Sequence, residues 1–94
     1  MKTYYSEYSA HCARYYFAMK SLGKTYSDPN FVAVVKALRL FNDQEKRYLQ
    51  CCYTTTNLSL AIDKIKKQDH VKTGYVWKLI TRFEKAIATY RGLI

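Results

Sequence analysis

Glycine and proline are scarce in this 94-residue sequence, which has three glycines and one proline. Domains built from many short strands need frequent Gly and Pro in their turns, so this scarcity argues against a turn-rich β fold. Disorder is disfavoured as well, because hydrophobic residues make up 49% of the chain and can form a core. A chain of this length makes one domain. The sequence therefore predicts a single helical domain over residues 1–94.

Motifs for metal binding and catalysis are also lacking. The three cysteines, Cys12, Cys51 and Cys52, show no CxxC spacing, and their odd number with one adjacent pair does not suggest a disulfide framework. Reduced thiols in the core are the better interpretation. His11 and His70 are isolated from any nucleophile motif, and there is no glycine-rich phosphate loop. We therefore expect a protein that is not an enzyme and that uses no metal or other cofactor.

Long apolar runs are absent too. Lys36 and Arg39 interrupt the most hydrophobic stretch, so no segment approaches the roughly 18 apolar residues of a membrane-spanning helix. The first nine residues, MKTYYSEYS, lack the apolar segment of a secretion signal. These absences predict a cytoplasmic protein without a membrane anchor.

Acidic residues are few, and the resulting charge is strongly positive. Sixteen Lys and Arg residues face seven Asp and Glu residues, which gives a net charge of +9. The surplus is spread along the chain with mild enrichment toward the C-terminus, since residues 60–94 hold eight basic and three acidic side chains. Such a charge indicates a polyanionic partner, which can be a nucleic acid, an anionic membrane surface or an acidic protein.

What the chain has in abundance is helical periodicity and tyrosine. Residues 3–41 are expected to form the N-terminal helices, the first of them over residues 3–22. Apolar and aromatic residues recur there at steps of three and four, which predicts one buried face. That face would comprise Tyr5, Tyr8, Cys12, Tyr15, Met19 and Leu22. It either lies across the core of the domain or, through Tyr5, Tyr8 and Tyr15, forms a surface for a partner or a second copy.

Capping residues predict where the next helices begin. Asp28 can cap a helix whose first residue is Pro29, where the missing N–H costs nothing. Asn42 and Glu45 have the spacing of a capping box. Residues 53–57 are β-branched or polar and are expected to form a loop. The inward residues of these two helices would be Phe31, Val34, Val35, Leu38 and Phe41, then Tyr48, Leu49 and Cys52.

Residues 42–94 then end in two helices separated by a polar turn at residues 66–71. Thr73 is the predicted N-cap of the last helix. The buried faces would comprise Leu58, Ala61, Ile62 and Ile65 in the fourth helix, and Val76, Leu79, Ile80, Phe83, Ala86 or Ile87, and Tyr90 in the fifth. The opposite face of the fifth helix carries Trp77, Lys78, Thr81, Arg82 and Lys85. The whole is an all-α, compact bundle of about five helices with a C-terminal helix-turn-helix-like pair.

This half of the chain resembles phage transcription regulators built on the sigma factor region 4 fold. The likeness covers the acidic capped helix from Asp43 to Tyr53, the helix from Leu58 to Ile65, the Val71–Val76 turn, and the closing Arg82–Lys85 segment. It departs at the small residue that this family carries about ten residues before the Val of its second helix. That place is taken by Lys66, which implies either three to five extra residues in the turn or another kind of helix pair.

The resemblance implies double-stranded DNA as the partner and the last helix as its reader. The expected DNA-binding residues are Lys67, Lys72, Thr73, Tyr75, Trp77, Lys78, Thr81, Arg82 and Lys85. Three other readings remain open: a plain basic bundle, an RNA-binding protein, and a small phage-encoded inhibitor of a host protein such as RNA polymerase or a defence protein. A homodimer is compatible with each of them.

Overall fold

The computed structural model describes residues 5–55 and 57–94, which fold into five helices. Within these two ranges no residue forms a strand. The predicted all-α bundle is therefore confirmed. The helices are α1 (Ser6–Ser21), α2 (Pro29–Leu38), α3 (Asp43–Thr54), α4 (Leu58–Asp69) and α5 (Thr73–Tyr90).

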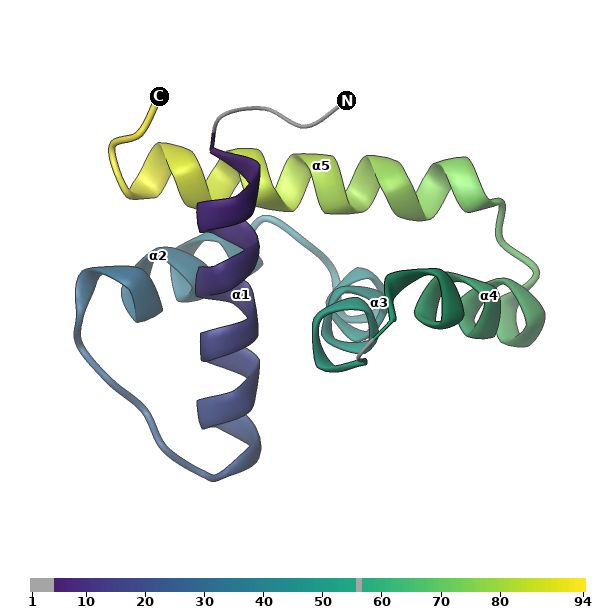
Figure 1. The fold of residues 1–94 in the computed structure, drawn as a ribbon, viewed down its shortest axis with the longest axis horizontal. Coiled ribbons are helices and arrows are strands. Elements are labelled where there is room, and N and C mark those ends of the chain that lie inside the picture. Colours follow the sequence, from purple (N-terminus) through teal and green to yellow (C-terminus); the bar gives the residue numbers. More distant parts are fainter. Residues whose placement is uncertain (1–4, 56) are drawn as a thin grey trace.

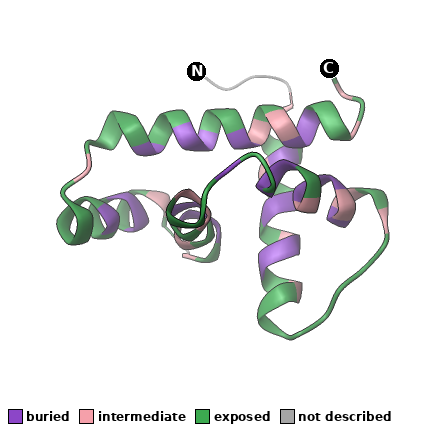
Figure 2. Ribbon diagram, turned by 180° about the vertical axis from the view of Figure 1, so that it is seen from behind, coloured by how far each residue is buried: buried purple, intermediate pink, exposed green. Residues whose placement is uncertain are grey.

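The longest helix, α5, organises the others. It packs against each of the other four helices. In Figure 1, α1 and α2 lie beside the C-terminal half of α5, whereas α3 and α4 lie beside its N-terminal half. Figure 2 shows that the buried residues of α5 face these helices and that its other side is exposed. One side of α5 thus completes the core while the other side meets solvent.

The predicted caps of α2 and α3 are confirmed. The side chain of Asp28 accepts a hydrogen bond from the Phe31 N–H at 3.1 Å, and Pro29 is the first residue of α2. Asn42 and Glu45 form a reciprocal capping box, in which each side chain accepts from the backbone N–H of the other at 2.8 and 2.9 Å. These bonds satisfy N–H groups that a helix start otherwise leaves without partners, so the sequence fixes both starts locally.

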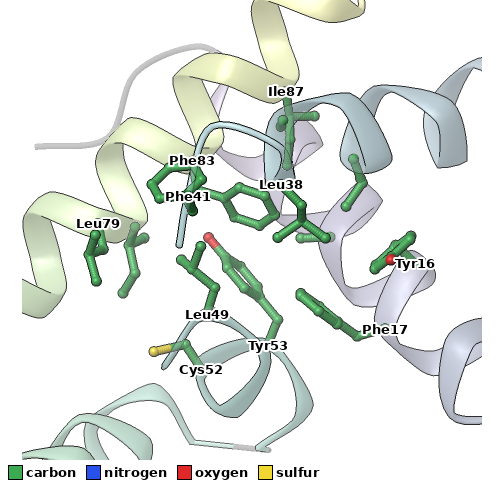
Figure 3. Close-up of a cluster of buried hydrophobic side chains, with 14 of the residues drawn as sticks. Tyr16, Phe17, Leu38, Phe41, Leu49, Cys52, Tyr53, Leu79, Phe83 and Ile87 are labelled. Carbon is green, nitrogen blue, oxygen red and sulfur yellow. The ribbon is translucent and has the colours of Figure 1, made fainter. Parts of the chain in front are cut away.

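An aromatic cluster around Phe83 forms the centre of the core. Phe83 is fully buried, and its ring centroid lies 5.6 Å from that of Tyr53, 5.9 Å from Phe41 and 6.5 Å from Phe17. These rings come from α1, α3, α5 and the segment after α2, as Figure 3 shows. Leu49 is also fully buried there. Burying such rings contributes roughly 1.5–3 kcal/mol each, so this cluster joins four parts of the chain.

The buried face of α1 differs from the predicted one. Its fully or largely buried residues are Ser9, Cys12, Ala13, Tyr16 and Phe17. Of the predicted face, Cys12 is buried, Tyr5, Tyr15 and Met19 are half-buried, and Tyr8 and Leu22 are exposed. The face is rotated because small residues at positions 9 and 13 allow α1 to approach its neighbours closely. Tyrosine tolerates the boundary, where its ring is covered and its hydroxyl remains near water.

Two helix ends in the C-terminal half also differ from those expected. The turn predicted at residues 66–71 was placed too early, because α4 continues to Asp69 and the connection consists of residues 70–72. His70 ends α4 in a left-handed conformation with φ of 56°, and its N–H donates to the Lys66 carbonyl oxygen at 2.9 Å. α3 likewise extends through Tyr53 to Thr54 into the predicted loop. Lys66 and its polar neighbours are good helix formers, and polarity alone misplaced the helix end.

The start of α5 lies one residue from its expected place. Lys72, and not Thr73, is the N-cap, and no side chain bonds to the free N–H groups there. Val71 and Val76 flank this start and both pack on the core, which is the placement of a hydrophobic staple. Apolar packing therefore sets this boundary. At the other end Tyr90, predicted to be buried, is 45% exposed.

Candidate nucleic-acid interface

The solvent side of α5 carries the cationic face that the sequence suggested. Lys78, Thr81 and Lys85 are exposed and lie opposite the buried side of the helix, since they are about half a turn away from it. Trp77, 46% exposed, lies on one flank and Arg82, with a side chain 59% exposed, lies on the other. Four of these residues line a shallow hollow of about 420 Å³: Trp77, Lys78, Thr81 and Arg82.

The guanidinium group of Arg82 has two contacts within the domain. The group lies over the Phe41 ring at 5.0 Å from the ring centroid, and its Nη1 lies 3.9 Å from a carboxylate oxygen of Glu45. Glu45 also belongs to the capping box of α3. This placement restricts the rotamers of Arg82 while leaving more than half of the side chain open to a ligand. A cation fixed in this way loses less conformational entropy when it binds.

The start of α5 adds further groups that can meet an anion. Lys72, Thr73 and Tyr75 are exposed there, and the Tyr75 ring packs edge-on against Tyr48 with centroids 6.4 Å apart. The first N–H groups of a helix lack partners within the helix, and they point along the positive end of its dipole. Lys72, Thr73 and Tyr75 directly precede the residues of the cationic face in the sequence.

Lys67 does not join this surface. It lies on α4, about half a turn from the buried residues Ile62 and Ile65 that face α3 and α5. Its side chain therefore points away from α5. Of the nine expected DNA-binding residues, eight lie along α5 and its N-cap, and Lys67 lies apart from them on α4.

Tyrosine hydroxyls satisfy three of the acidic side chains. Tyr15 donates to Asp28 at 3.0 Å, and Tyr53 donates to Glu84 at 2.7 Å. Tyr48 donates to Asp69 while accepting from the Gln44 side-chain amide at 2.9 Å. We call these three pairs the tyrosine–carboxylate pairs. They join α1 to α2, α3 to α4 and α3 to α5, so each one links two helices with a neutral donor.

The surroundings of these hydroxyls raise their pKa values. Burial raises the pKa of Tyr53 far above its usual value, and the negative charge of Glu84 adds to this effect. The hydrogen bond to Asp69 is the main cause that raises the pKa of Tyr48. For Tyr15, burial raises the pKa and the bond to Asp28 contributes further. The hydroxyls thus remain protonated donors at neutral pH, and the carboxylates keep their partners.

The tyrosine–carboxylate pairs leave the basic side chains with little counter-charge. Between side chains of residues 5–55 and 57–94, one Lys or Arg nitrogen comes within 4.0 Å of a carboxylate, namely that of Arg82 with Glu45. The single acidic residue of α5, Glu84, is half-buried and directed at Tyr53. No exposed residue of α5 is acidic, and Glu45 of α3 contacts this face at Arg82. The outer face of α5 therefore carries a surplus of cations, which is the electrostatic pattern that attracts a polyanion.

The tyrosines of α1 take part in contacts within the domain. Tyr8 donates to the Asn30 side-chain oxygen at 2.7 Å, and Arg91 donates to the same oxygen at 2.7 Å and to the Tyr8 hydroxyl at 3.3 Å. Tyr15 is occupied by Asp28. Of the three residues predicted as a partner surface, these two join α1 to α2 and to the end of α5. The third, Tyr5, lines a groove.

That groove is a feature the sequence did not reveal. It has a volume of about 730 Å³ and lies between α1 and α5, next to the first residue of α4. Its apolar lining includes Tyr5, Ala10, Leu58, Trp77 and Ile80. The tyrosine–carboxylate pairs were missed as well, because the two partners lie 13 to 31 residues apart and no local spacing marks them.

The cysteines behave as core thiols. Cys12, Cys51 and Cys52 are all free, with Cys12 and Cys52 buried and Cys51 half-buried. Burial raises the pKa of the Cys52 thiol to about 12. It also raises the pKa of Cys12, an effect that the nearby Arg91 partly offsets. Among the described residues no three His, Cys, Asp or Glu side chains gather in a group that could hold a metal ion.

Comparisons of the chain with protein-family models, curated proteins and solved structures found no significant match. In the described part of the chain, no helix has the length and apolar character needed to cross a membrane.

Proposed function

We propose that the protein is a non-enzymatic DNA-binding regulator, of the kind found in phages and mobile elements, and that α5 contacts duplex DNA. The observation that carries this proposal is the outer face of α5, where Lys78, Lys85 and Arg82 are exposed beside Thr81 and Trp77. Among the described residues, the one carboxylate within 4.0 Å of these cations is that of Glu45, which contacts Arg82. A helix of this width fits the major groove of B-form DNA. The three-residue connection from α4 also matches the usual length of a helix-turn-helix turn.

The residues divide into two roles in this proposal. Lys72, at the start of the helix, and Lys78 and Lys85, on its outer face, neutralise phosphates, which gives affinity without sequence preference. Arg82, positioned by Phe41 and Glu45, reaches a base edge, where an Arg favours guanine. Lys67 is left out of the interface, since it faces away from α5.

The test is a salt series of duplex-DNA binding with matched lysine variants. The logarithm of the binding constant should fall linearly with the logarithm of salt concentration, at about 0.9 units of slope per phosphate contacted. Lys78→Gln and Lys85→Gln should each lower that slope by about one unit. Lys24→Gln removes the same charge from an exposed position between α1 and α2 and should leave the slope unchanged. Equal slopes for all three variants would refute the assignment of α5.

Arg82 provides the test of sequence reading. Arg82→Ala should cost about 1–3 kcal/mol on a selected preferred site and much less on random duplex. Lys78→Gln should weaken both duplexes alike, because a phosphate contact carries no sequence information. A variant of Arg82 that weakens both equally would make it a phosphate contact.

A protein-binding inhibitor is the second candidate, and the groove between α1 and α5 favours it. Its lining includes the half-buried Tyr5 and the exposed Trp77, and aromatic residues of this kind are typical of protein interfaces. If the protein is such an inhibitor, its binding to DNA should be weak, and Lys78→Gln should not change it. Trp77→Ala should abolish partner binding, while charge variants of α5 should preserve it.

A further inference from the structure

A third pocket is lined by no residue of α4 or α5. It has a volume of about 240 Å³ and lies between the C-terminal half of α1, the last residue of α2 and α3. Its floor consists of Tyr16, Phe17 and Leu38, and its rim includes Lys20 and Lys46. None of the described residues that line it is acidic.

The floor is apolar and well packed. Tyr16, Phe17 and Leu38 are 6–8% exposed, and Figure 3 shows Tyr16 and Phe17 of α1 on one side of the cluster, next to Leu38 of α2. A cavity of about 150 Å³ with apolar walls holds a benzene molecule. The pocket is therefore large enough for one aromatic ring with a small polar group attached.

The rim supplies positive charge without a counter-ion. Lys20 is exposed and Lys46 is half-buried, and they approach the pocket from two different helices. Within residues 5–55 and 57–94, neither ammonium group comes within 4.0 Å of a carboxylate. Gln50, one helical turn after Lys46, adds an amide that can donate to the same ligand.

The hydroxyl of Tyr16 is the group that points to a ligand. Tyr16 is 8% exposed, and its hydroxyl has no hydrogen-bond partner in the described part of the chain. Among the described residues, the fully buried side-chain oxygen without a partner is that of Ser9, so the Tyr16 hydroxyl retains access to solvent. Tyr16 also lines the pocket. A largely buried tyrosine normally finds a partner for its hydroxyl. A ligand in the pocket can supply that partner.

We propose that this pocket binds a small aromatic anion, with its ring on Tyr16, Phe17 and Leu38 and its charged group between Lys20 and Lys46. The anionic group accepts a hydrogen bond from the Tyr16 hydroxyl. A carboxylate and a phosphate monoester share this chemistry. The site is separate from the proposed DNA interface, so failure of DNA binding would leave it unaffected.

The test is a titration of the isotope-labelled full chain, followed by NMR, with benzoate, phenyl phosphate, benzyl alcohol and acetate. Benzoate and phenyl phosphate should shift the amide signals around Lys20 and Lys46. Benzyl alcohol keeps the ring and acetate keeps the charge, and each should bind at least about tenfold more weakly, a difference of about 1.4 kcal/mol. Tighter binding of phenyl phosphate than of benzoate would identify a phosphate ligand, and the reverse order a carboxylate. Equal binding of benzoate and acetate, or of benzoate and benzyl alcohol, would overturn the proposal.

Variants separate the contributions of the rim and the floor. Lys20→Met with Lys46→Met should weaken benzoate about tenfold or more, and Tyr16→Phe, which keeps the ring, should weaken it by about threefold to tenfold. Lys64→Met, on the exposed side of α4, is the matched control and should bind benzoate as the unaltered chain does. Circular dichroism establishes that each variant is folded. Unchanged affinity in the double variant would show that the lysines do not hold the anion.

Discussion

Helices α1 and α5 pack against each other and are both rich in aromatic residues, yet their polar side chains are placed differently. On α1 the hydroxyls of Tyr8 and Tyr15 bond to Asn30 and Asp28 at the start of α2. On α5 the lysines and Thr81 face solvent, and the one carboxylate, Glu84, is directed inward. The hydroxyls of Tyr8 and Tyr15 are therefore used within the fold, whereas α5 is structural on one side and available for binding on the other.

The largest difference in stability is expected between the two sides of α5. Phe83 and Trp77 are two aromatic residues on opposite sides of the helix, one fully buried and the other 46% exposed. Phe83→Ala should lower the free energy of unfolding by about 3–5 kcal/mol because it opens a cavity in the core. Trp77→Ala should change it by less than about 0.5 kcal/mol. Urea unfolding measures both, and similar costs would show that α5 has no available side.

A smaller effect is expected where α5 is tied inward. Tyr53→Phe keeps the ring in the core and removes the donor to Glu84, so it should cost about 1–3 kcal/mol. The matched control is Thr54→Val, at the neighbouring exposed position, where the hydroxyl bonds to the Gln50 carbonyl oxygen within α3. A Tyr53→Phe variant as stable as the unaltered chain would mean that the hydrogen bond between Tyr53 and Glu84 does not stabilise the fold.

Alkaline pH should lower the free energy of unfolding through groups in the core. Burial raises the pKa of Cys52 from 9.0 to about 12, so the folded chain holds this proton more tightly than the unfolded chain does. The corresponding stability is complete below pH 9 and is lost as pH rises from 9 toward 12, on the order of 1 kcal/mol by pH 10. Tyr53, whose pKa is also raised, acts in the same direction. Urea unfolding at pH 7, 9 and 10 measures the loss, and constant stability would contradict it.

The smallest effect is expected on the buried side of α1. Ser9 is fully buried, and its hydroxyl oxygen has no partner in the described ranges. Ser9→Ala removes this unsatisfied group without changing the close approach of α1, so stability should stay within about 0.5 kcal/mol or rise. Ser9→Val, which adds bulk at the same place, should cost about 1–3 kcal/mol through overpacking. Thermal unfolding compares the two, and a large loss with alanine would reveal a hydrogen bond of Ser9.

The sequence predicted α5 better than α1, and the reason is physical. α5 alternates apolar and charged residues, so Val76, Leu79, Ile80, Phe83 and Ile87 mark one side unambiguously, and all five are buried. The α1 segment from Cys12 to Met19 is apolar or aromatic at nearly every position, so two different faces fit the helical period equally well. Only close packing of small residues with the rest of the chain decides between them.

Helix ends could be predicted where the stop or start signal is local. The caps at Asp28 and Asn42 depend on side chains within three residues, and both are confirmed. The end of α4 depends on Tyr48 bonding to Asp69 from 21 residues away and on His70 adopting a left-handed conformation. Sequence spacing contains neither fact. The exposed members of the candidate site were recognisable in the sequence, whereas the separation of Lys67 required the packing of α4.

The tyrosine–carboxylate pairs have a consequence for how this protein can change over time. Because neutral hydroxyls satisfy the carboxylates that link the helices, the lysines on the outside of α5 are not needed as partners in the fold. Replacing them alters the electrostatic surface with little loss of stability. Natural selection can therefore revise what α5 binds, one surface residue at a time, while the scaffold beneath it remains intact.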